Sequence, residues 1–236
     1  WAAKVGIRAS NNDLLNETVL APRISFAYKM AKNSQFSFAY GDFTQTPNSE
    51  YIKYSNNHQF ESEKASHYIL NFQYNKNGKT FRAEAYFKDY SNLVKFNTEK
   101  ATYNSVYDNT GSGYAKGLDL FWRDGKSIKN VEYWISYSYI DSERDYKNFP
   151  TQATQNFIAS NSLSIVAKYW INDWKSQVGF TNSYSSGRPY NNPNETKFMN
   201  EKTKSYNSLS FNWAYLLSQQ KILYFSVSNV LGTQNV

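Results

Sequence analysis

The sequence predicts an all-β fold: an antiparallel, up-and-down transmembrane β-barrel to which this chain contributes about eleven strands. Three observations predict it. Apolar and polar side chains alternate with a period of two in about eleven segments, as in strands with one apolar and one polar face. The connections between segments alternate between very short and long. Aromatic residues make up 18% of the chain, and both strands and membrane interfaces favour them.

The first three segments show the alternation most simply. Residues 1–10 are expected to form a first strand, followed by a polar connection over residues 11–21. A tight turn at residues 31–34 then joins two strands, the second of which ends near Pro47. The apolar positions of this hairpin are Ile24, Phe26, Tyr28, Met30, Phe36, Phe38 and Tyr40.

The rest of the chain repeats this unit four times, as a long connection, a strand, a short turn and a return strand. The turn Asn77-Gly78 is the strongest hairpin signal, because Asn-Gly readily adopts positive φ. The long connections are expected at residues 48–65, 97–112, 141–159 and 188–204, and the later turns at residues 124–125, 172–173 and 219–220.

Loops that alternate in this way are typical of bacterial outer-membrane barrels, which have short periplasmic turns and longer external loops. No apolar run approaches the roughly eighteen residues that a membrane helix needs, so helical insertion is excluded. No segment has persuasive helical periodicity either. The mean hydropathy of −0.72 does not argue against a barrel, because only every second residue of each strand faces lipid.

Charge and cysteine content narrow the class of function further. The chain has no cysteine, which excludes disulfides and thiolate metal sites. Its net charge is +7, but the lysines and arginines are scattered without a basic block, so we do not expect nucleic-acid binding. The net positive charge is compatible with binding of an anionic ligand or with contact to a phosphate-rich outer leaflet.

Residues 109–120, NTGSGYAKGLDL, resemble a strand in the C-terminal barrel half of the family of TonB-dependent outer-membrane receptors, with Asp119 where Glu is commoner. Pro22-Arg23 at the start of a strand, and Tyr40-Gly41 followed by Gln45-Thr46-Pro47, are similar to its recurrent strand features. Two further segments are similar to an emerging strand and to the final hairpin: residues 186–190, SGRPY, and residues 229–232, NVLG.

The resemblance implies that residues 1–236 are part of a 22-stranded barrel, with the plug domain and the last strands outside this sequence. It implies TonB-dependent uptake of a scarce nutrient, such as a siderophore or another metal chelate, at the bacterial outer membrane. The implied partners are outer-membrane lipid and lipopolysaccharide, a small-molecule or metal-chelate ligand, and the TonB complex, which would be contacted through the plug.

The candidate ligand-binding residues are Arg188 and Tyr190, which stand where a strand emerges into an external loop. An arginine and a tyrosine there combine charge-assisted hydrogen bonds with ring stacking. We expect no enzyme, no catalytic residue, no metal site and no cofactor. The polar strand faces should line a wet lumen with Arg23, Lys29, His67, Gln73, Arg82, Glu84, Asp119, Glu132 and Lys168.

Alternative interpretations stay open at this point. In a soluble, aromatic-rich, lectin-like β-sandwich, the apolar positions would form a buried core; they include Phe26, Phe72, Leu120, Ile135, Ile165, Phe211 and Phe225. An outer-membrane hydrolase would need a base such as His67, but no nucleophile elbow accompanies it. The spacing of His58 and His67 matches no standard zinc motif.

Overall fold

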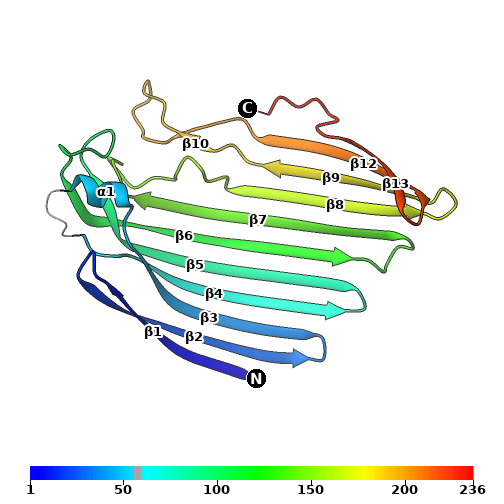
Figure 1. The fold of residues 1–236 in the computed structure, drawn as a ribbon, viewed down its shortest axis with the longest axis horizontal. Helices are drawn as coiled ribbons and strands as arrows, with labels where there is room; N and C mark the ends of the chain where they lie inside the picture. Colours follow the sequence, from blue (N-terminus) through cyan, green and yellow to red (C-terminus); the bar gives the residue numbers. More distant parts are fainter. Residues whose placement is uncertain (56–59, 236) are drawn as a thin grey trace.

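The structure is a computed structural model and describes residues 1–55 and 60–235. Eleven antiparallel strands form one sheet in chain order, from β1 to β9 and then β12 and β13 (Figure 1). A separate two-stranded sheet pairs β10 with β11. The strands are β1 (Ala2–Asn12), β2 (Glu17–Ala31), β3 (Ser34–Gln45), β4 (Glu63–Lys76), β5 (Lys79–Phe96), β6 (Tyr107–Asp124), β7 (Val131–Asp145), β8 (Asn161–Ile171), β9 (Ser176–Ser185), β10 (Pro189–Tyr190), β11 (Glu201–Lys202), β12 (Tyr206–Ser218) and β13 (Lys221–Val227).

The predicted order of long and short connections is confirmed. All four long connections lie at one end of the sheet, together with the short turn between β1 and β2, and the other short turns lie at the opposite end (Figure 1). The turn between β4 and β5 has positive φ at Asn77 (51°) and Gly78 (74°), as expected of a primed hairpin turn. The first connection is shorter than predicted, because β1 extends to Asn12 and pairs it with Glu17, leaving residues 13–16 as the turn.

The first long connection contains a helix, α1 (Ser49–Tyr54), which the sequence did not predict. Asn48 caps it, accepting a hydrogen bond from the Glu50 backbone N–H at 3.0 Å. Six residues are too few to show a helical period, which explains why it was missed. No helix in the described part of the chain has the length and apolar character needed to cross a membrane.

The second long connection is shorter than predicted, because β6 begins at Tyr107 and not after Ser112. The added residues continue the pairing with β5 after two irregularities, which lie between Tyr90 and Lys95. Asp, Asn and Gly at residues 108–111 have low strand propensity, so the sequence favoured a loop where cross-strand pairing holds a strand.

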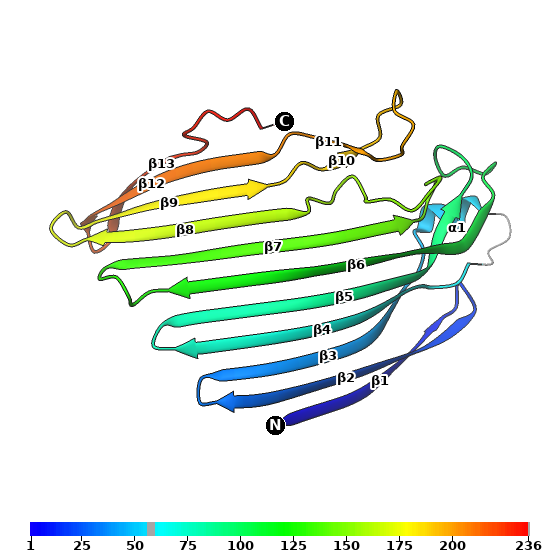
Figure 2. The same cartoon turned by 180° about the vertical axis from the view of Figure 1, so that it is seen from behind.

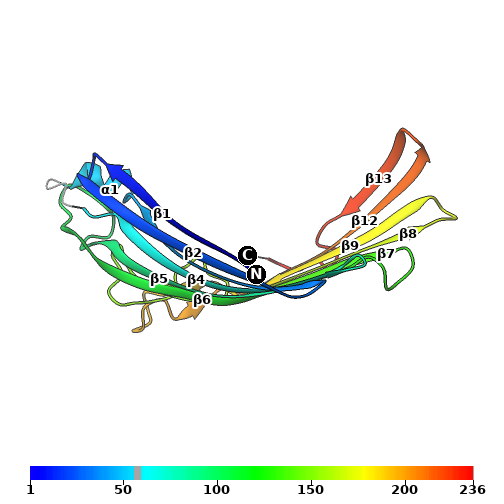
Figure 3. The ribbon, with the colours of Figure 1, turned by 90° about the horizontal axis from the view of Figure 1, so that it is seen from below.

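The sheet is a single curved layer (Figure 2). Seen edge-on in Figure 3, β1 and β13 rise on the same side. In the described residues, no second sheet covers the apolar face. The alternative of a soluble β-sandwich, which requires a core buried between two sheets, is therefore not favoured. Of the seven residues that test this point, Phe26, Ile135, Phe211 and Phe225 are exposed, and Phe72, Leu120 and Ile165 are half-buried.

The strands are staggered along the sheet. One row of direct partners begins at Ser34, the first residue of β3 beside a short turn. Seven strand steps later it reaches Leu209, near the long-connection end of β12. Such stagger is what tilted strands of a barrel require. The full row is Ser34, Tyr74, Phe81, Trp122, Ile135, Ile165, Asn182 and Leu209.

The buried hydrophobic cluster of the described residues lies at the long-connection end of the sheet, where α1 meets β5 and β6. Ile52 of α1 packs there with Phe60 and with Val94 and Phe96 of β5. The ring of Tyr107 lies 5.9 Å from that of Phe96. This cluster, which we call the external cap, fixes α1 against the ends of β5 and β6.

Candidate functional site

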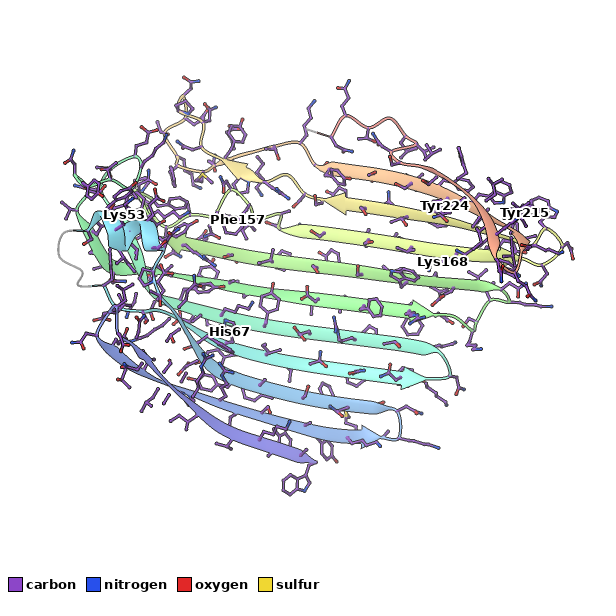
Figure 4. The ribbon with its side chains drawn as sticks, in the orientation of Figure 1. Lys53, His67, Phe157, Lys168, Tyr215 and Tyr224 are labelled. Carbon is purple, nitrogen blue, oxygen red and sulfur yellow. The ribbon has the colours of Figure 1, made fainter. Side chains whose placement is uncertain are left out.

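The strand register places the predicted lumen residues together on the polar face of the sheet. Lys29 continues through Gln35 and Gln73 to Arg82 along one row of partners. In Figure 4, where the last hairpin is seen nearly edge-on, Tyr215 and Tyr224 lie on its two sides. The other predicted lumen residues occupy neighbouring rows of this face: Arg23, His67, Glu84, Asp119, Glu132 and Lys168.

Two carboxylates of this face lie at the same level along the strands. Glu84 stands directly opposite Asp119, and Asn71 donates a hydrogen bond to Glu84 at 3.1 Å. Fixed charges of this kind cannot face hydrocarbon without a large free-energy cost. The polar face is therefore the wet one.

Nearer the short turns, oppositely charged side chains meet. Glu132 accepts hydrogen bonds from Arg123, one of them through Nε at 2.8 Å. Glu132 also stands opposite Lys168, whose Nζ lies 4.9 Å from the ring centre of Trp134. These contacts give Glu132 and Lys168 local structural partners.

Aromatic contacts join the long connections to one another. Phe149, in the connection between β7 and β8, lies 4.9 Å from Tyr146. It also lies 4.9 Å from Phe198, in the connection between β9 and β12. Burial raises the pKa of the Tyr146 hydroxyl. These ring contacts pack two of the long connections against each other.

Arg188 and Tyr190 lie in the connection between β9 and β12, just after the end of β9. The Arg188 N–H donates to Thr203 Oγ1 at 3.0 Å, and the Arg188 carbonyl accepts from the Thr203 N–H at 2.9 Å. Tyr190 pairs with Glu201 in the two-stranded sheet. Gly187 permits this approach, because a Cβ there would collide with the Thr203 carbonyl oxygen.

Both residues line one cavity of about 640 Å³. Its chemistry is cationic and aromatic: Arg188 and Lys204 supply the charge, and Tyr190 and Tyr206 supply rings with hydroxyls. No carboxylate is among the described lining residues, and no ion pair within residues 1–55 and 60–235 involves either cation. The site can hold an anionic group beside a flat ring.

Lys204 and Tyr206 were not predicted as site residues. A usable signal was present, since residues 188–204 contain four basic and two acidic side chains. The sequence could not show that β12 begins beside Ser185 of β9 and so returns Tyr206 to the cavity. His58 lies outside the described residues.

Residues 1–230 match the family described as "TonB dependent receptor-like, beta-barrel". The chain belongs to this family. TonB-dependent receptors are outer-membrane proteins and act as receptors and transporters. No curated protein matches the chain.

Solved TonB-dependent receptors share its architecture. The outer membrane transporter YddB from Escherichia coli is 13% identical with a TM-score of 0.75; the alignment covers 97% of this chain and 39% of that one. The FrpB iron transporter from Neisseria meningitidis is 13% identical with a TM-score of 0.71, covering 92% and 34%. The ferric enterobactin receptor of Pseudomonas aeruginosa, solved with enterobactin, is 14% identical with a TM-score of 0.78, covering 97% and 37%.

These likenesses concern the fold. At 13–14% identity they establish the antiparallel barrel wall and say nothing of the ligand. The chain spans less than two fifths of the length of each of these three structures, so the open sheet is part of such a barrel wall. The predicted fold class and family are confirmed.

Proposed function

We propose that this chain is part of an outer-membrane receptor that takes up a scarce nutrient, such as a siderophore or another metal chelate, by TonB-dependent transport. The supporting observation is the pair of opposite faces on one staggered, single-layer sheet. One face exposes Phe26, Phe211 and Phe225, as a lipid-facing surface should. The other carries the charged rows of a wet lumen.

The ligand would first be captured at the external end. We propose Arg188 and Tyr190 for this role, because they line the cationic, aromatic cavity at the base of the long connections. Several of the similar structures are iron or ferric-siderophore receptors, which supports a metal chelate as the cargo. Residues 1–236 would form part of a 22-stranded barrel in contact with lipid and lipopolysaccharide. The TonB complex would act through a plug outside this sequence.

Uptake by the full-length receptor tests the proposal. The receptor is produced in cells that lack their own ferric-chelate receptors, and entry of ⁵⁵Fe supplied as catecholate, hydroxamate or citrate complexes is followed. We expect uptake of at least one complex, abolished by a protonophore. Absence of energy-dependent uptake for metal chelates of all three classes would remove the proposed cargo.

Capture is tested separately by binding to the double variant Arg188→Ala, Tyr190→Ala. We expect affinity for the transported complex to fall at least tenfold, because a charge-assisted contact and a stacking surface are both lost. The matched control is Lys197→Ala, Tyr103→Ala, which alters a cation and an exposed tyrosine outside the cavity. Equal affinity in the two double variants would exclude Arg188 and Tyr190 from capture.

A further inference from the structure

A second cavity lies against the polar face, between β1 and β4 and apart from the capture site. Its volume is about 320 Å³. Four consecutive strands of the sheet contribute to it, so it belongs to the barrel wall and not to a loop. The lining residues that matter here are Lys4, Arg23, Gly41, Phe43, His67 and Ile69.

Three side chains from three strands stack in this cavity. The Arg23 guanidinium carbon lies 4.5 Å from the centre of the Phe43 ring. The centres of the Phe43 and His67 rings are also 4.5 Å apart, with the planes inclined by 36°. A cation over a ring is held by the ring quadrupole. The stack therefore orients the Arg23 head group beside a flat apolar surface.

Gly41 makes room for this arrangement. It stands opposite Arg23 in the register, and a Cβ at Gly41 would lie 3.2 Å from Arg23 Cγ and 3.3 Å from Phe43 Cε2. Such contacts are tighter than ordinary van der Waals distances. The absence of a side chain at Gly41 lets Arg23 and Phe43 lie low across β3 and leaves the cavity open.

No carboxylate of the described residues compensates the positive charge of this cavity. Lys4 and Arg23 are its two full cations, and its described lining contains no carboxylate. Neither cation takes part in an ion pair within the described residues. Lys88, directly opposite His67 on β5, adds a further cation next to the stack. A guanidinium without a carboxylate partner retains its full set of donors for an anion.

We propose that this cavity is a binding site for an aromatic anion, such as an aromatic carboxylate. The anionic group is held by Arg23 and Lys4, and the ring lies against the apolar lining that Phe43 and Ile69 provide. The site is on the barrel wall, and its function does not depend on which solute the receptor transports.

Photolabelling of the purified full-length receptor in detergent tests the site. The probe is 4-azidobenzoate, and its neutral analogue 4-azidobenzamide is the matched control ligand. Peptides that carry the label are identified by mass spectrometry. We expect saturable labelling within β1 to β4, at least tenfold weaker with the amide. Absent labelling, labelling confined to other regions, or equal labelling by both compounds would overturn the proposal.

Variants of Arg23 and Lys4 test whether these two cations hold the anionic group of the probe. We expect Arg23→Gln to reduce labelling within β1 to β4 at least tenfold and Lys4→Gln to reduce it several-fold. Arg82→Gln removes an exposed cation of the same face that does not line the cavity, and labelling should be unchanged. Lys4 is exposed, so its variant keeps the test informative if Arg23→Gln does not fold. Unchanged labelling in folded Arg23→Gln or Lys4→Gln would overturn the proposal. Labelling needs no energy source, so its result is independent of the uptake experiment.

Discussion

At the scale of single residues, the polar face repeatedly pairs a glycine with a long side chain on the next strand. Gly113 stands opposite Arg144, and Gly179 stands opposite Asn212. At each glycine, a Cβ would come within 3 Å of the partner side chain. These glycines allow the partner side chain to approach the backbone closely and do not have an unusual φ. Side chains of the lumen wall can therefore lie across the neighbouring strands.

Substitution of Gly113 should displace Arg144. A Cβ at Gly113 would lie 2.8 Å from Arg144 Cγ and 2.5 Å from the Glu143 carbonyl oxygen. The Arg144 guanidinium would then leave the Tyr90 ring, whose centre is 4.3 Å away. We expect Gly113→Ala to destabilise the receptor by about 1–3 kcal/mol. Thermal unfolding of the full-length protein in detergent measures this change.

Gly125→Ala is the control, because the nearest atom to a Cβ there is 3.7 Å away, an ordinary contact. Equal unfolding temperatures for the two variants would show that Gly113 is not required for the packing of Arg144.

Glu63 should stabilise the external cap through one hydrogen bond. Its Oε1 accepts from the Val94 N–H at 3.2 Å, and Val94 is only 1% exposed. Glu63→Ala leaves this donor buried and unpaired, which should cost about 1–3 kcal/mol. Faster amide hydrogen exchange at Val94 is the measurement. Glu63→Gln keeps an acceptor, so the Val94 amide should exchange at close to the native rate in this variant. A native exchange rate at Val94 in Glu63→Ala as well would mean that the hydrogen bond from Val94 to Glu63 is unimportant.

The same carboxyl predicts a pH dependence. Burial raises the pKa of Glu63 above its ordinary value, so the native state holds its proton at a pH where the unfolded state has lost it. The stability contribution is fully present below the ordinary pKa and declines as pH rises through the raised native pKa. Glu63→Gln should flatten this decline in the exchange of Val94. An identical pH profile would assign the decline to another group.

At the scale of elements, the long connections hold one another in place. The contact between Phe149 and Phe198 joins two connections that are separate in sequence. We expect Phe149→Ala to increase amide exchange throughout residues 191–200, because an aromatic pair contributes roughly 0.5–1.5 kcal/mol beyond its buried area. The unfolding temperature of the barrel should change little.

The control for this contact is Phe157→Ala. Phe157 belongs to the same connection but is 54% exposed, and no aromatic pair in the described residues includes it. Exchange in residues 191–200 that rises equally in both variants would argue against a specific contact.

Element boundaries show how far the sequence can be interpreted. The alternation at Phe26, Phe72 and Phe211 correctly predicted which residues share a face, because a strand period of two is set by backbone geometry. The predicted start of β6 was wrong, because its first residues are polar and are held in the strand by pairing with β5. A local sequence pattern does not contain that pairing. The cap at Asn48 was a readable signal for α1.

The candidate site was only partly predictable for a related reason. Arg188 and Tyr190 stand beside a visible strand end, whereas Lys204 and Tyr206 reach the cavity only through the register between β9 and β12. Phe43 was likewise not singled out, because its place between Arg23 and His67 depends on two strand registers at once. Such long-range pairings cannot be inferred from residues that are neighbours in the sequence.

At the scale of the whole molecule, the stagger predicts how the strands cross the bilayer. Ser34 and Leu209 belong to one row of partners, yet tilted strands should place them at opposite interfaces. Phe38 and Trp213 lie four residues from that row in opposite directions along the sheet and should share the mid-membrane depth. Their strands are visibly offset in Figure 1.

Single spin labels at positions 34, 38, 209 and 213 of the full-length receptor measure these depths, since this region has no native cysteine. We expect high oxygen contact at 38 and 213, and low contact at 34 and 209. Labels at 211 and 212 provide the face control: 211 should contact lipid-soluble oxygen and 212 a water-soluble relaxant. High oxygen contact at 34 and 209 with low contact at 38 and 213 would mean that the strands are upright.

The sequential strand order also bears on how the wall is assembled. Within the main sheet, each pairing joins strands that follow one another along the chain, so each new strand adds to an edge already formed at little loop-closure entropy. Low sequence separation of contacts favours fast folding. In a closed barrel, only the meeting of the first and last edges joins distant parts of the polypeptide. That final seam, and not the growth of the wall, should therefore set the kinetic barrier to assembly.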